Sequence, residues 1–239
     1  MTTPPRFNLE PGRIIGKRYV VEGLLGEGWE GQVYRIRERL TGIRRAMKLF
    51  FPERNPKNIT LKRYAKKLDK LQGCALAINY HHTETLEVDG TRVNCLVSEL
   101  VEGESLGDFI ARQPGQRLAT FEALHIIYGL AKGLEEIHAA REYHGDLHDG
   151  NVLVKRVGIF IRPRLFDFMS HPGGRREPMQ EDVVDVTKIL FGAIGGSRHY
   201  GAQPEIVKSV CCGRRSDLVR QKFPTASHLR RHLETFVWE

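Results

Sequence analysis

The first hundred residues alternate between apolar and polar positions in a way that predicts β-strands. The stretches RYVVEGLL and GQVYRIRERL flank a glycine-rich turn, and GIRRAMKLFF follows a second turn at Thr41-Gly42. These three runs predict three strands in a meander. A further hairpin is predicted in TETLEVDGTRVNCLVSEL, because Asp89-Gly90 favours a tight turn between two strands.

The apolar spacing changes to three and four residues in other parts of the chain, which predicts helices. Residues 58–71 form one such pattern inside the strand-rich part. From SLGDFIARQ onward helices dominate, with buried helices predicted over 120–140 and 181–196 and a capped amphipathic helix in TASHLRRHLETFVW. Two short strands around 152–154 and 163–167 are expected to interrupt this helical part.

This change of period predicts an α+β protein with two lobes. Residues 1–18 carry several Pro and Gly residues and are expected to form an N-terminal arm. Residues 19–101 are expected to form a lobe built on an antiparallel sheet, and residues 102–239 a mainly helical lobe.

Composition narrows the class of protein without identifying it. The 239 residues are 41% hydrophobic and 28% charged, which is ordinary for a globular protein. No apolar run approaches the roughly 20 residues of a membrane span, the N-terminus lacks a secretory pattern, and the four cysteines form no Cys-x-x-Cys pair. A cytoplasmic protein that does not contact membranes is therefore expected.

The net charge is 37 − 29 = +8. The basic residues are spread along the chain and lack a nucleic-acid motif, so specific nucleic-acid binding is not expected.

The stretch YHGDLHDGNVLV, residues 143–154, concentrates polar side chains before an apolar run. Asp146 and Asn151 are five residues apart, and a glycine precedes each of them. Asp146 is a candidate to orient an attacking hydroxyl or accept its proton, and Asn151 offers an amide oxygen to a divalent metal. Asp167, in LFDFM, adds a carboxylate at the end of a short predicted strand. Because Mg²⁺ prefers few carboxylates together with phosphate oxygens, Asn151 and Asp167 suit this ion better than calcium or zinc.

A second group of candidates lies in the strand-rich part. GEGWEGQV places Gly26, Gly28 and Gly31 between two predicted strands, where backbone N–H groups can cover a triphosphate. A glycine-rich turn without a ligand is the alternative. Lys48 lies in the apolar strand RAMKLF, on the same face as Ala46. Considered alone, Lys48 is most simply a lysine of an edge strand, whereas a lysine directed into a cleft needs an anion.

Taken together, GEGWEGQV, AMK, LVSELVEGESL, HGDLHDGN and FDFM follow the order and approximate spacing of the protein-kinase fold, which this chain resembles. The resemblance extends over most of the chain, and it includes Asp182, similar to the residue that braces the catalytic loop in the family. It implies an ATP- and Mg²⁺-dependent phosphotransferase of two lobes, similar to bacterial serine/threonine kinases, with a protein as its acceptor.

The resemblance also implies a role for each matching residue. Asp146 is the catalytic base, assisted by Lys48 and His148, and Asn151 and Asp167 hold Mg²⁺. The remaining residues are implied to surround ATP, with the glycines over its phosphates, Lys48 at its α- and β-phosphates and the others around its adenine: Leu25, Gly26, Gly28, Gly31, Val33, Ala46, Lys48, Glu99, Val101 and Leu153.

Four departures from the family pattern keep alternatives open. The helical Glu that pairs with the strand lysine is missing, because its position falls on Tyr64. Gly145 replaces the Arg that pairs with a phosphorylated activation loop, and the activation segment shrinks to residues 168–181. His148 replaces a Lys, which makes the loop similar to that of aminoglycoside and choline kinases. These features predict a kinase that activation-loop phosphorylation does not switch; a small-molecule kinase and an ATP-binding pseudokinase scaffold are the alternatives.

Overall fold

The computed structural model describes residues 6–171 and 173–237, and the chain divides into two compact units. The first unit runs to Gln72 and includes Ile78–Val101, and the second consists of Gly73–Ala77 and the chain from Glu102 onward. The segment 73–77 belongs to the second unit because it is bonded there. The N–H of Leu165, for example, donates to the carbonyl oxygen of Leu76 at 2.7 Å.

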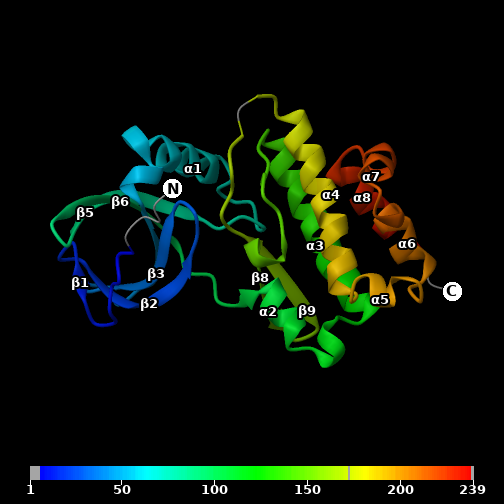
Figure 1. Ribbon diagram of the computed structural model, residues 1–239, viewed down its shortest axis with the longest axis horizontal. Coiled ribbons are helices and arrows are strands. Elements are labelled where there is room, and N and C mark those ends of the chain that lie inside the picture. Colours follow the sequence, from blue (N-terminus) through cyan, green and yellow to red (C-terminus); the bar gives the residue numbers. More distant parts are fainter. Residues whose placement is uncertain (1–5, 172, 238–239) are drawn as a thin grey trace. The chain divides into compact units, whose positions relative to one another are not determined.

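The first unit is built on an antiparallel sheet whose strands follow the order β1-β2-β3-β4-β6-β5 (Figure 1). Its strands are β1 Ile14–Ile15, β2 Tyr19–Glu27, β3 Gly31–Glu38, β4 Arg44–Phe50, β5 Tyr80–Val88 and β6 Thr91–Glu99. The meander of β2, β3 and β4 and the β5–β6 hairpin confirm the strand pattern of the sequence. Asp89 and Gly90 both have a positive φ, 49° and 76°, which these two residue types tolerate in a tight turn.

The helix of the first unit, α1 Ile59–Lys70, packs against β5 and β6. Its apolar spacing buries Leu61, Tyr64 and Leu68, as an amphipathic pattern requires. Two 3₁₀ turns, Pro52–Arg54 and Pro56–Asn58, connect β4 to this helix. The helix predicted over 58–71 is therefore confirmed, and one of its buried positions is the tyrosine that occupies the place of the family's helical Glu.

Of the N-terminal arm predicted over residues 1–18, residues 1–5 lie outside the described residues, and residues 6–18 pack on the first unit instead of forming an arm. Ile14 and Ile15 pair with Val20 and Tyr19 as the edge strand β1. Leu9 and Ile15 are only 4% and 2% exposed and belong to the apolar core of the sheet. The apolar residues in this stretch are too few and too widely spaced to produce a recognisable period, and only Leu9 and Ile15 are buried, whereas Ile14 is 51% exposed.

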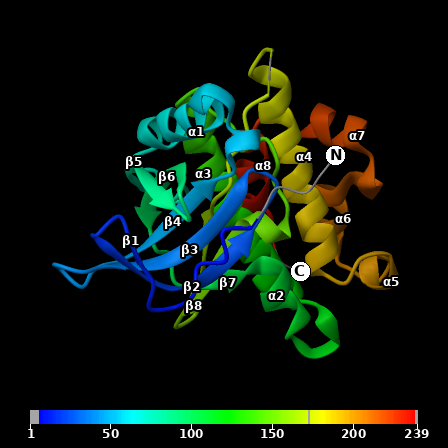
Figure 2. The same ribbon diagram turned by 60° about the vertical axis from the view of Figure 1, so that its left-hand side comes forward.

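The second unit is mainly helical and carries a small antiparallel sheet of order β7-β8-β9. The strands are β7 Glu104–Ser105, β8 Val152–Val157 and β9 Phe160–Leu165. The helices are α2 Leu106–Ala111, α3 Thr120–Ala139, α4 Arg176–Ala193, α5 Ser197–Tyr200, α6 Glu205–Cys211, α7 Ser216–Lys222 and α8 Ala226–Glu234. Helices α3 and α4 lie side by side, and α8 packs on α3 (Figures 1 and 2).

Two details of the second unit differ from the sequence predictions. Helix α4 begins at Arg176 rather than at residue 181, and Pro178 does not prevent this, because the first turn of a helix tolerates a proline. The prediction of a side-chain cap for the last helix is wrong, since the hydroxyl of Thr225 pairs with Nδ1 of His228 at 2.8 Å rather than with a backbone N–H.

Among the helices of the described residues, none is long and apolar enough to span a membrane.

Candidate functional site

The residues predicted to bind the nucleotide or act in catalysis are divided between the two units. The first unit holds Leu25, Gly26, Gly28, Gly31, Val33, Ala46, Lys48, Glu99 and Val101. The second unit holds Asp146, His148, Asn151, Leu153 and Asp167. Within each unit the structure brings the predicted residues onto neighbouring strands or into one loop.

The glycine-rich turn joins β2 to β3. The N–H of Gly28 donates to the carbonyl oxygen of Gly31 at 2.9 Å, which closes the turn. A Cβ on Gly31 would lie 1.9 Å from the carbonyl oxygen of Leu49 on β4. The packing of β3 against β4 by itself therefore requires a glycine at this position. A Cβ on Gly26 would meet no atom within 4 Å. The space beside Gly26 is therefore open, which is the condition for a ligand to approach the backbone closely.

Lys48 lies on β4 opposite Val33 of β3, and only 9% of the residue is exposed. Its ammonium group donates to Oε2 of Glu30 at 2.7 Å, and it lies 4.9 Å from the centre of the Tyr64 ring. The expected helical carboxylate is thus replaced by one from the glycine-rich turn, together with an aromatic face on α1. Sequence reasoning missed Glu30, because the spacing of the turn does not reveal which carboxylate lies beside the lysine.

Two further contacts hold the glycine-rich turn in this position. The N–H of Phe51 donates to the carbonyl oxygen of Glu30 at 2.9 Å, so backbone as well as side chain is fixed. The guanidinium carbon of Arg54 lies 3.3 Å from the centre of the Trp29 ring, in a cation–π contact. The turn is consequently anchored to the β4–α1 connection on both sides of Glu30.

In the first unit, the positions implied to meet adenine lie on β2, β3 and β4 and at or just after the end of β6, while Leu153 lies on β8 of the second unit. Val33 and Ala46 are half-buried, which leaves part of each apolar side chain accessible. At Glu99 the N–H donates to the carbonyl oxygen of Asn79 at 3.0 Å, while the carboxylate accepts from the N–H of Asn79 at 2.8 Å. This double contact fixes the backbone just before Val101.

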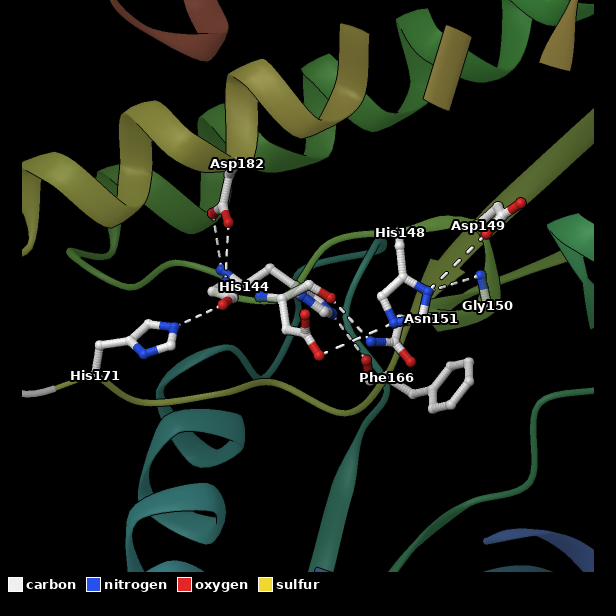
Figure 3. A network of polar contacts seen from close by, with 10 residues as sticks. His144, His148, Asp149, Gly150, Asn151, Phe166, His171 and Asp182 are labelled. Atoms are coloured by element: carbon white, nitrogen blue, oxygen red, sulfur yellow. Dashed lines mark hydrogen bonds and ion pairs between the residues drawn. The ribbon is translucent and has the colours of Figure 1, made fainter. Parts of the chain in front are cut away.

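In the second unit, a buried carboxylate on α4 supports the loop that follows α3. Asp182 is 0% exposed, and it accepts hydrogen bonds from the N–H groups of His144 and Gly145 at 2.8 and 2.9 Å (Figure 3). Nε2 of His138, in the last turn of α3, lies 3.0 Å from the same carboxylate. Charge-assisted bonds of this kind are stronger than neutral ones, so the backbone just before Asp146 is rigidly placed.

His144 connects this loop to the segment that leads to Asp167. It is 0% exposed, its Nδ1 accepts from the N–H of Asp146 at 3.3 Å, and its Nε2 donates to the carbonyl oxygen of Phe166 at 2.8 Å. These two roles assign the neutral Nε2–H tautomer, because Nδ1 must be free to accept. His144 therefore packs beneath the loop with bonds to the backbone.

The side chain of Asp146 is 57% exposed, in contrast to the buried carboxylate of Asp182. Nε2 of His148 lies 3.9 Å from its Oδ2, and Nδ1 of His148 accepts from the N–H of Gly150 at 3.1 Å. Asn151 is 7% exposed, and its amide Nδ2 donates to the carbonyl oxygen of Asp146 at 2.9 Å. The carboxylate is thus held on a fixed backbone while its oxygens face solvent.

Asn151 and Asp167 lie on adjacent stretches of backbone. The N–H of Phe166 donates to the carbonyl oxygen of Asn151 at 3.3 Å, and Asp167 follows with a left-handed φ of 60°. Because the amide nitrogen of Asn151 is engaged, its oxygen is the atom left for a cation. In the described part of the chain, no three His, Cys, Asp or Glu side chains gather as a metal cage. One amide oxygen and one carboxylate suit Mg²⁺, which takes its other ligands from phosphate and water.

Comparison with known proteins identifies the family. The model of the protein kinase domain matches residues 19–218, which is most of the chain, and the chain belongs to this family. The crystal structure of the PknI kinase domain of Mycobacterium tuberculosis superposes with a TM-score of 0.63 and 18% identity, over 95% of this chain and 97% of that one. This likeness confirms the predicted α+β kinase fold, with an antiparallel sheet followed by a helical part.

Among the similar proteins are bacterial serine/threonine-protein kinases. A probable serine/threonine-protein kinase of Clostridium perfringens is 29% identical over 209 residues, which are 87% of this chain and 28% of that protein. The serine/threonine-protein kinase pkn2 of Myxococcus xanthus is 28% identical over 208 residues, which are 86% of this chain and 23% of that protein. The chain thus spans about a quarter of the length of these relatives and corresponds to a segment of each.

Proposed function

We propose that this chain is an ATP- and Mg²⁺-dependent kinase domain that phosphorylates serine or threonine residues of a protein. The observation that carries the proposal is the exposed carboxylate of Asp146 on a backbone fixed by buried Asp182. The family match and the names of the bacterial relatives support a protein as acceptor rather than a small molecule. Retention of Lys48, Asn151 and Asp167 favours an active enzyme over a pseudokinase scaffold.

Asp146 acts on the acceptor hydroxyl in this proposal. Its oxygens accept the hydroxyl proton and orient the attacking oxygen, while the backbone bonds of Asp182 and Asn151 keep the carboxylate in place. His148 is 53% exposed and donates a hydrogen bond toward the same reacting groups. Most of the rate enhancement then comes from the positioning of reactants, which suits a loop with a rigid backbone.

The first unit binds ATP in this proposal. Lys48 contacts the α- and β-phosphates, and the open backbone at Gly26 covers the phosphates with N–H groups. The adenine contacts backbone groups of Glu99 and Val101 and the half-buried apolar side chains that include Val33.

Asn151 and Asp167 would hold Mg²⁺ through one amide oxygen and one carboxylate. When bound, this ion neutralises phosphate charge. The chain contributes the placement of the two ligands, because the bond between Phe166 and Asn151 keeps their backbones adjacent.

Glu30 supplies the carboxylate that orients Lys48. The ion pair is mostly buried, with 10% of the lysine side chain and 17% of the glutamate side chain exposed. A lysine with four rotatable bonds needs such a partner to keep its ammonium group at one place. The missing helical Glu therefore does not argue against activity, since a carboxylate in the turn performs the same task.

A pair of carboxylates in one loop gives a matched test. Asp146→Asn is expected to lower phosphate transfer from labelled ATP by about 10²- to 10⁴-fold, because it removes the proton acceptor, while ATP binding measured by calorimetry stays nearly unchanged. Asp149→Asn is the control, because its side chain is also 57% exposed and lies three residues away. Equal turnover in both variants would refute the assignment of Asp146. Label that appears on small molecules of a lysate rather than on proteins would refute the protein acceptor.

A further inference from the structure

Gly145, directly before Asp146, cannot carry a side chain in this structure. Its φ is 85°, in the left-handed region, and a Cβ there would lie 2.9 Å from Cε2 of Tyr143 and 3.2 Å from Nε2 of His171. The space that the family's arginine would need at its base is therefore filled by two rings. One of these rings belongs to the segment that follows Asp167.

His171 makes three polar contacts with the loop. Its Nε2 donates to the carbonyl oxygen of Gly145 at 2.6 Å, and its backbone N–H donates to the hydroxyl oxygen of Tyr143 at 2.8 Å. The same hydroxyl donates back to the carbonyl oxygen of His171 at 3.3 Å. The two rings are nearly parallel, with centres 6.2 Å apart and planes inclined by 9°. Figure 3 shows the His171 ring directed from its own segment toward the loop that contains His144.

Residues on either side of His171 also contact the loop that precedes Asp146. The N–H of Met169 donates to the carbonyl oxygen of His144 at 2.8 Å. At the other end, the guanidinium of Arg175 lies 3.8 Å from the carboxylate of Glu142, whose side chain is 7% exposed. The contacts at 169, 171 and 175 thus meet 144, 143–145 and 142 in antiparallel order, which aligns these three residues with the loop.

We propose that His171 is a positioning residue, which holds the segment after Asp167 on the catalytic loop and so keeps Asp146 and Asp167 in place without phosphorylation. This inference rests on the proposed kinase function. An Arg at position 145 would need an added phosphate to hold the segment, whereas the Nε2–H of His171 needs only a backbone carbonyl, which is always present.

The segment between Asp167 and Asp182 contains few residues that could be phosphorylated. Between residues 168 and 181, Ser170 is the one residue with a hydroxyl group. It is exposed and directly precedes His171. A switch of the usual kind would have to act through Ser170, and the proposal therefore expects that removal of its hydroxyl changes nothing.

Two substitutions separate the donor of His171 from its ring. His171→Gln keeps an amide N–H at about the place of Nε2 but loses the ring, and His171→Phe keeps the ring but loses the donor. We expect His171→Phe to lower kcat by about 3- to 10-fold, the range of one hydrogen bond, with KM for ATP within about twofold of the wild type. His171→Gln should recover most of kcat. His125→Phe is the control, since His125 also lies against aromatic rings, stacked on Phe121 and tilted against Phe160, but is part of α3.

Amide hydrogen exchange supplies a readout that needs no turnover. The N–H groups of Met169 and His171 are bonded to the loop, so His171→Phe should speed their exchange and His171→Gln should not. Because His171 is exposed, we expect both of its variants to remain folded. A thermal unfolding scan checks this expectation.

The outcomes are distinct. Wild-type activity in His171→Phe, unchanged exchange at Met169, or loss of activity in Ser170→Ala would each overturn the proposal. Reduced kcat with faster exchange in His171→Phe, recovery in His171→Gln, and full activity in Ser170→Ala would support it. If the wild-type chain itself transferred no phosphate, the proposed function would fail, and the exchange measurement would still decide whether His171 holds the segment.

Discussion

Two regions of the molecule each lack a residue that the kinase pattern leads one to expect, and they replace it by different means. In the first unit, α1 has Tyr64 in place of a carboxylate, and Lys48 pairs with Glu30 of the glycine-rich turn at 2.7 Å. The charge pair survives, although one partner has moved to another element. In the second unit, Gly145 has no side chain, and His171 bonds to its carbonyl oxygen. Here a bond from an imidazole to the backbone stands in place of a charge pair.

The difference predicts different weaknesses in the two regions. A contact between two side chains is lost when either side chain changes, and its strength depends on charge. A contact to the backbone survives changes at one of its ends and depends on how firmly that backbone is held. In the second unit the holding is done from α4 by Asp182, which accepts from two backbone N–H groups. This buried acid is therefore where the second region is most vulnerable.

We expect Asp182→Ala to have the largest effect on stability. The change leaves the N–H groups of His144 and Gly145 without their acceptor in a site that is 0% exposed, and His138 loses its partner. Loss of a buried, hydrogen-bonded charge costs about 3–5 kcal/mol, and chemical denaturation followed by circular dichroism measures it.

Asp185→Asn is the control, three residues further along α4. Burial raises the pKa of the Asp185 carboxyl above its ordinary value. A raised folded-state pKa means that this acid favours the folded state below its unfolded pKa and loses that contribution as the pH rises through its folded pKa. At neutral pH its neutral replacement should therefore cost less than about 1 kcal/mol. Similar losses in Asp182→Ala and Asp185→Asn would contradict the special role of Asp182.

Much of the fold could be predicted from the sequence because its signals are local. The spacing of Leu61, Tyr64 and Leu68 is a property of one helix, and Asp89-Gly90 determines its own turn. Asp146 and Asn151 were likewise identified as candidates because they lie within one loop, and the structure joins them by a direct hydrogen bond.

The partners of Lys48 and Gly145 could not be predicted in this way. Glu30 precedes Lys48 by 18 residues, and it reaches the lysine only through the register between β3 and β4. His171 follows Gly145 by 26 residues and reaches it through the path of an irregular segment. Neither register nor loop path leaves a period in the sequence, so a carboxylate in a turn and a histidine in a loop look like any other polar residue.

Glu30→Gln is expected to have an intermediate effect, on activity. The substitution keeps the size of the side chain but removes its charge, and kcat/KM for ATP should fall by about tenfold. If Glu30 acts by orienting Lys48, a carboxylate placed on α1 at position 64 should restore activity, since Tyr64 already lies 4.9 Å from the ammonium group. Tyr64→Glu in the Glu30→Gln background should therefore recover a large part of the loss.

Glu27→Gln is the matched control for this experiment. It changes another carboxylate of the same turn, which bonds to Gln32 rather than to Lys48. Its kcat/KM should stay within about twofold of the wild type. Equal losses in Glu27→Gln and Glu30→Gln would show that removal of either negative charge from the turn lowers activity. The orientation of Lys48 would then not depend on Glu30.

The smallest expected effect is the salt dependence that separates the two regions. Raising the ionic strength from about 0.05 M to about 1 M shortens the screening length from over 10 Å to about 3 Å. The Lys48–Glu30 pair retains 10% and 17% side-chain exposure, so salt should narrow the gap between wild type and Glu30→Gln by about twofold or less. The gap between wild type and His171→Phe should not change, because a bond between an imidazole N–H and a carbonyl requires no charge on either group. Steady-state kinetics of the wild type, Glu30→Gln and His171→Phe at both ionic strengths tests this directly. An equal salt response of both gaps would mean that the two regions are held by the same kind of force, and the contrast between them would be lost.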